Sequence, residues 1–83
     1  MEVKGVAYYQ IDTEALALHE VELELKNAGM ENIKLKVLDS WETENVPEDW
    51  FDDYTFEIEF CGIINCDVEE FLKNATCVDE IYD

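Results

Sequence analysis

The stretch Tyr54–Ile64, read as YTFEIEFCGII, alternates between apolar and polar or small side chains. Such alternation is typical of a strand with one buried face. Asn32–Trp41, read as NIKLKVLDSW, alternates in the same way. Together the two segments predict an antiparallel hairpin. Its buried face carries Ile33, Leu35 and Val37 from the first strand, and Tyr54, Phe56, Ile58 and Phe60 from the second.

Charged residues occupy the outer face of this predicted hairpin. Lys34 and Lys36 alternate with the buried residues of the first strand, and Glu57 and Glu59 do the same in the second. Opposite charges that face each other on neighbouring strands contribute about 0.2–1 kcal/mol per pair. We therefore expect the two lysines to lie opposite the two glutamates.

A strand and a helix are predicted before the hairpin. Glu2–Ile11 is rich in Val, Tyr and Ile and carries apolar residues on both of its faces, which predicts a central strand. Thr13–Ala28 is predicted as a helix, with Asp12 as its N-cap and Gly29 just past its end. The alternation within Glu20–Leu25 also fits a strand, but the length and the caps favour a helix. The predicted core stripe of this helix is Ala17, Leu18, Val21, Leu25 and Ala28.

A short helix and a last strand are predicted after the hairpin. Asp67–Ala75 has apolar residues at helical spacing, and Thr76–Tyr82 is β-branched and aromatic. The predicted core residues of this helix are Val68, Phe71, Leu72 and Ala75.

The order of these elements predicts the fold. Strand–helix–strand–strand–helix–strand is the ferredoxin-like βαββαβ pattern of an α+β protein, a four-stranded antiparallel sheet with two helices on one face. The 83 residues are expected to form a single domain, 1–83. The alternative is an α+β meander that ends in a helix.

Net charge is the strongest compositional signal. Twenty-two acidic residues face five lysines and no arginine, which gives −17 at pH 7. A sphere of this chain length is about 30 Å across, and duplex DNA of that length carries about 18 charges. Nucleic acid and anionic membranes are therefore excluded as expected partners, and a basic protein surface is favoured. The alternative is that the charge serves solubility alone.

The cysteine count and the hydropathy indicate the cellular compartment. Cys61, Cys66 and Cys77 are an odd number, which favours free thiols in a reducing compartment. No apolar run is long enough to cross a membrane, and no signal peptide is recognised at the N-terminus. We expect a cytoplasmic protein.

The acidic segment Asp39–Tyr54, read as DSWETENVPEDWFDDY, is the predicted functional site. It holds seven carboxylates, two tryptophans and a phenylalanine, but no lysine. Rings that supply buried area and acids that steer a basic partner are typical of a protein interface. The alternative is that the rings at 50–51 cap the sheet and leave a solvated acidic rim. The predicted partner-binding residues are Trp41, Glu44, Asp49, Trp50, Asp52, Asp53, Glu57 and Glu59.

No motif for catalysis or metal binding is found. His19 and the three cysteines lack the spacing of zinc ligands, and the acidic segment lacks the pattern of a calcium-binding loop. We expect no cofactor and no metal, and we expect that the protein is not an enzyme.

In size, acidity and lack of catalytic residues, the chain resembles phage-encoded inhibitors such as anti-CRISPR proteins. The resemblance is one of character and includes no motif. It implies a DNA-mimic decoy whose partner is a CRISPR effector or another nucleic-acid enzyme. Two alternatives remain open. One is a regulatory or ligand-sensing βαββαβ module that forms a homodimer through its sheet, and the other is a structural subunit whose charge serves solubility.

Overall fold

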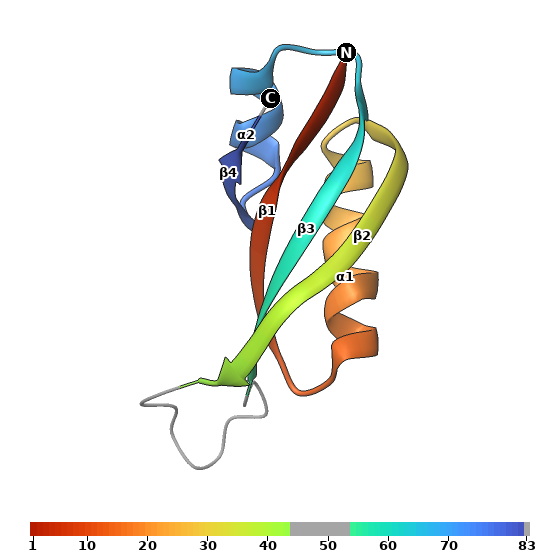
Figure 1. Ribbon diagram of the computed structural model, residues 1–83. Helices are drawn as coiled ribbons and strands as arrows, with labels where there is room; N and C mark the ends of the chain where they lie inside the picture. Colours follow the sequence, from red (N-terminus) through yellow and green to blue (C-terminus); the bar gives the residue numbers. More distant parts are fainter. Residues whose placement is uncertain (44–53, 83) are drawn as a thin grey trace.

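The computed structural model describes residues 1–43 and 54–82. The chain forms, in order, β1 (Glu2–Ile11), α1 (Glu14–Asn27), β2 (Met30–Glu42), β3 (Tyr54–Ile64), α2 (Val68–Asn74) and β4 (Val78–Ile81) (Figure 1). The strands form one antiparallel sheet in the order β2-β3-β1-β4. The predicted α+β class, the four-stranded sheet and the two helices are confirmed. The alternative meander is wrong, because β4 follows α2 and pairs with β1.

The hydrophobic core lies between one face of the sheet and the two helices. Val21 and Leu25 of α1, Phe60 of β3 and Phe71 of α2 belong to one buried cluster. The rings of Phe60 and Phe71 are 6.4 Å apart at their centroids. Because both helices contact the same face of the sheet, the opposite face has no helix over it. In Figure 1, α1 lies behind β2.

The ends of α1 follow ordinary capping chemistry, with one difference from the prediction. The N-cap is Thr13, whose side-chain oxygen accepts a hydrogen bond from the Leu16 backbone N–H at 3.3 Å. The prediction of Asp12 is wrong by one residue, because the extended backbone at Thr13 turns its hydroxyl toward the first turn. Gly29 follows the helix with a φ of 103°, the left-handed conformation that favours glycine.

The second helix buries a narrower face than predicted. Phe71 and Ala75 are buried and Val68 is half-buried, but Leu72 is 39% exposed. The prediction of Leu72 as a core residue is wrong. Neighbouring helical residues point about 100° apart, so a helix that directs Phe71 into the core turns Leu72 toward its edge.

A carboxylate on α1 holds the segment between α2 and β4. Glu24 Oε1 accepts hydrogen bonds from the Thr76 hydroxyl at 2.7 Å and from the Cys77 backbone N–H at 2.8 Å. Burial, together with the Glu24 carboxylate, raises the pKa of the Cys77 thiol to about 12. Cys77 is therefore protonated, and unreactive as a nucleophile, at neutral pH.

Strand β4 approaches β1 closely at a glycine. A Cβ atom at Gly5 would collide with the backbone carbonyl oxygen of Glu80 and would lie 2.9 Å from the Phe60 ring. Only glycine leaves room for both the edge strand and the core aromatic ring at this position.

The pairing of β2 with β3 contains two register shifts, one between Glu31 and Lys34 and one between Val37 and Asp39. Val37 lies opposite Ile58 and Asp39 lies opposite Glu57, so Leu38 is a bulge without a partner on β3. Lys36 faces Glu59 as predicted. Lys34 faces Cys61 instead, so the expected pairing of Lys34 with a glutamate is wrong.

Candidate functional site on the open face of the sheet

The bulge at Leu38 decides which face of the sheet Trp41 occupies. Ile33, Leu35 and Val37 pack against the core, and strict alternation would place Trp41 on that same face. The extra residue reverses the alternation. Trp41 therefore lies opposite Thr55 on the face without helices, here called the open face. The open face carries Glu2, Lys4, Val6 and Tyr8 of β1, Glu31, Lys34, Lys36, Asp39 and Trp41 of β2, Thr55, Glu57, Glu59, Cys61 and Ile63 of β3, and Glu80 of β4.

Two rings and two carboxylates meet on the half of the open face nearest Trp41. The ring of Tyr8 reaches over β3 toward that of Trp41, with centroids 6.1 Å apart and planes inclined at 59°. The Tyr8 hydroxyl donates a hydrogen bond of 2.8 Å to Glu57 Oε2. Asp39 lies directly opposite Glu57 on the neighbouring strand. We call Tyr8, Asp39, Trp41 and Glu57 the aromatic–acid cluster.

The two carboxylates of this cluster are not neutralised by a neighbouring lysine. Within the described residues, neither Asp39 nor Glu57 forms an ion pair with a lysine; the ion pair on this face joins Lys4 to Glu59 at 3.6 Å. Like charges that face each other across two strands are destabilising. This half of the open face therefore combines exposed ring surface with uncompensated negative charge.

The opposite half of the open face carries both signs of charge. Cys61 lies between Lys4 on β1 and Lys34 on β2, and Lys36 lies one position further along. Four glutamates on the same half offset these three lysines: Glu2, Glu31, Glu59 and Glu80. Because Lys4 and Lys36 flank Glu59, the uncompensated negative charge of the aromatic–acid cluster does not extend to that residue.

The structure brings together only part of the predicted site. Trp41 and Glu57 meet through Tyr8, while Glu59 belongs to the lysine-rich half. Five predicted residues lie outside the described residues: Glu44, Asp49, Trp50, Asp52 and Asp53. Tyr8 was not predicted, and Asp39 was predicted only as part of the acidic segment. Alternation in β1 puts Tyr8 on the same face as Lys4, which is a signal for an outward position, but nothing in the sequence marks the bulge that brings Asp39 beside Glu57.

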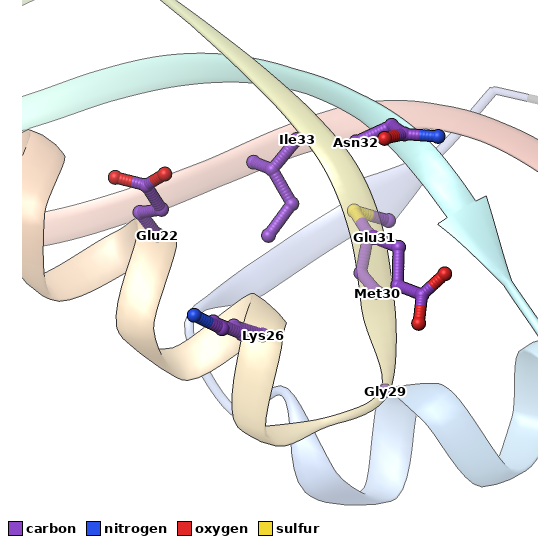
Figure 2. Close-up of a pocket in the computed structure, with 7 residues that line it drawn as sticks. All are labelled: Glu22, Lys26, Gly29, Met30, Glu31, Asn32 and Ile33. Atoms are coloured by element: carbon purple, nitrogen blue, oxygen red, sulfur yellow. The ribbon is translucent and has the colours of Figure 1, made fainter.

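The best-formed hollow lies elsewhere and lacks convergent polar groups. It has a volume of about 450 Å³ and lies between the end of α1 and the start of β2 (Figure 2). The carboxylates of Glu22 and Glu31 lie on opposite sides of this hollow, and the Ile33 side chain points into it. A binding site for a small polar molecule needs a few polar groups directed at one point. The open face is therefore the better candidate.

Residues 1–43 and 54–82 hold no group of three or more His, Cys, Asp and Glu side chains arranged to bind a metal ion. Neither helix in these ranges is long and apolar enough to cross a membrane. The expected absence of a metal, a cofactor and a catalytic activity stays a prediction.

The fold and the site define an α+β protein whose antiparallel sheet has one face without helices, acidic and aromatic at one end and of mixed charge at the other. No known protein family, curated protein or solved structure matches the chain.

Tyr8, the tyrosine of the cluster, should lose its proton at a higher pH than an ordinary tyrosine. The hydrogen bond to Glu57, with smaller contributions from burial and nearby charge, raises the Tyr8 pKa from 10.0 to about 12. Because the folded state holds this proton more tightly, Tyr8 stabilises the fold fully below about pH 10. That contribution is lost as the pH rises through about 12.

The difference in ultraviolet absorbance between the native protein and Tyr8→Phe reports this titration. Glu57→Gln should return the Tyr8 pKa toward 10.0. Ionisation of Tyr8 near pH 10 in the native protein, with circular dichroism still that of the folded state, would contradict the Tyr8–Glu57 hydrogen bond.

Proposed function

We propose that this protein is a small acidic inhibitor that acts as a DNA-mimic-like decoy and occupies a basic, nucleic-acid-binding surface of a partner protein. One observation carries the proposal: the exposed aromatic–acid cluster lies at the end of the hairpin from which the acidic segment continues. Rings bury area and carboxylates attract cationic groups, which are the two components of an interface for a basic partner.

The fold is proposed to be ferredoxin-like, the split βαβ arrangement. Support comes from the βαββαβ order and from the position of β3 between β1 and β2. In this arrangement the helices cover one face and leave the other available for binding. The single domain 1–83 belongs to the same proposal.

The decoy surface is proposed to be the hairpin end rather than the whole molecule. The molecule is 42 Å long, and duplex DNA of that length carries about 25 charges, more than the 17 of this chain. Asp39–Tyr54 concentrates seven carboxylates without a lysine, while three lysines lie on the other half of the open face. A basic partner is therefore attracted more strongly to the hairpin end than to the lysine-bearing half of the open face.

The proposed setting is the cytoplasm, and the proposed partner is a nucleic-acid enzyme such as a CRISPR effector, blocked as phage-encoded inhibitors block theirs. The free state of Cys61, Cys66 and Cys77 supports a reducing compartment. The net charge of −17 opposes direct contact with nucleic acid or with an anionic membrane.

A regulatory module that self-associates is the second candidate. The observation in its favour is that the lysines of the open face lie on one half and the aromatic–acid cluster on the other. A two-fold axis through the sheet would place Lys4 and Lys34 of one copy against Asp39 and Glu57 of the other. Against it stands the mutual repulsion of two chains that each carry −17.

Ionic strength separates the two candidates. A complex with a basic partner should weaken at least about tenfold between about 0.05 and 0.2 M salt, because several charge contacts are screened. A homodimer should change little over the same range, because salt screens both its opposite-charge pairs and the net repulsion of the two chains. Calorimetry with the captured partner, and sedimentation of the protein alone, measure the two responses. A salt-insensitive homodimer, together with no basic partner, would favour the self-associating module.

A further inference from the structure

We infer that the aromatic–acid cluster is a receptor for an arginine side chain presented by the basic partner. This inference rests on the proposed function and names the group that the site recognises. The occupant is argued from charge complementarity, ring exposure and the register of the three strands that supply the cluster.

The carboxylates of Asp39 and Glu57 favour binding of a cation between β2 and β3. Asp39 and Glu57 face each other in register, and no lysine of the described residues pairs with either of them. Their mutual repulsion is a cost that a shared cation would remove. The backbone N–H of Ser40 donates to Asp39 Oδ1 at 2.8 Å, and the Tyr8 hydroxyl donates to Glu57 Oε2. These bonds orient both carboxylates and leave other oxygen lone pairs free to accept.

The rings select a planar cation. Trp41 is 42% exposed, and its ring is inclined to that of Tyr8 rather than stacked on it. A guanidinium group can lie against an indole face while its N–H groups reach a carboxylate in pairs. The ammonium group of lysine is a more strongly hydrated point charge without a planar fork. The combination of ring and paired carboxylates therefore favours arginine over lysine.

The distribution of charge over the open face indicates where the arginine enters. Lys4 and Lys34 flank Cys61, about four residues further along the strands from the cluster, and they offset the glutamates of that half. The acidic segment that continues from the cluster holds no lysine, so it attracts a cationic segment more strongly. The arginine is therefore expected to arrive from the hairpin end of the sheet.

A nuclear magnetic resonance titration with two peptides of equal length and charge tests the inference. One peptide carries arginine and the other lysine as its only charged residue type. The arginine peptide should shift the indole N–H of Trp41 and the amides of Asp39 and Glu57. It should bind about two- to fivefold more tightly than the lysine peptide, the range for a cation over an exposed ring.

Three variants separate recognition from folding. Trp41→Leu should abolish the preference for arginine. Asp39→Asn should weaken binding of the arginine peptide. It should also raise the thermal unfolding temperature of the protein, because it removes the like-charge contact with Glu57. A purely structural role for Asp39 would not produce those opposite effects. Lys34→Gln is the matched control on the same strand, and it should keep the preference.

Equal binding of the two peptides, or a preference that survives Trp41→Leu, would overturn the inference. Shifts confined to residues outside the cluster would do the same. A different result would reject the proposed function without rejecting this inference. An arginine preference at Trp41 in a protein that does not compete with nucleic acid supports the receptor and rejects the decoy. Competition with nucleic acid for the partner, without a preference for the arginine peptide, would reject the arginine receptor and support the decoy proposal.

Discussion

Replacing Phe71 with alanine should lower the free energy of unfolding by about 3–5 kcal/mol. Phe71 is fully buried, and its ring meets that of Phe60 across the interface between α2 and the sheet. Truncation leaves a cavity that the surrounding core cannot fully close. A domain of 83 residues has a total stability of about 4–12 kcal/mol, so this one change removes much of it.

The next residue supplies the control for that loss. Leu72 lies on the same helix and is 39% exposed, so Leu72→Ala should cost less than about 1 kcal/mol. Urea unfolding followed by circular dichroism measures both variants. Similar losses for the two, or a loss below about 1 kcal/mol for Phe71→Ala, would mean that α2 does not pack on the sheet as described.

Neutralising three carboxylates of the acidic segment should weaken binding of the partner by about 100-fold or more. The variant changes Asp49, Asp52 and Asp53 to asparagine, which keeps side-chain size and removes only charge. If each aspartate meets a cationic group, its loss costs about 1 kcal/mol or more. Thermal unfolding of the free variant, compared with the native protein, should show that the fold is retained.

An equal change of net charge elsewhere tests whether position matters. Asp67→Asn combined with Glu69→Gln and Glu70→Gln also removes three charges, at the start of α2 and away from the hairpin end (Figure 1). This control should weaken the complex only a few-fold, through long-range attraction. Equal weakening by both triple variants would show that overall charge alone drives association. Undiminished binding by the variant of Asp49, Asp52 and Asp53 would contradict the decoy proposal.

The regular elements follow from local sequence patterns. The predicted bounds of β1 and β3 agree with the structure, because alternating β-branched and aromatic residues leave one register that buries the apolar set. For α1, Thr13 and Asp12 offer similar capping chemistry, so the sequence alone misplaced the cap by one residue. The exposure of Leu72 depends on how α2 rolls against Phe60, which is a tertiary contact.

The candidate site was less accessible from sequence than the fold. Trp41 and Glu57 were predicted from ring and acid content. Their juxtaposition with Tyr8 and Asp39 depends on a single bulged residue, Leu38. Leucine has no special backbone requirement, so a leucine at position 38 does not indicate a bulge. A one-residue change of register moves every following side chain to the other face, and that step places Asp39 and Trp41 on the open face beside Tyr8 and Glu57.

Competition between this protein and duplex DNA for the captured partner tests the central claim most directly. At fixed ionic strength, the apparent dissociation constant of the protein should rise in proportion to the concentration of DNA, because both ligands need the same basic surface. The neutralised variant Asp49→Asn, Asp52→Asn, Asp53→Asn should fail to displace DNA at concentrations at which the native protein displaces it. A ternary complex of partner, DNA and this protein, with an apparent dissociation constant independent of DNA, would contradict the account.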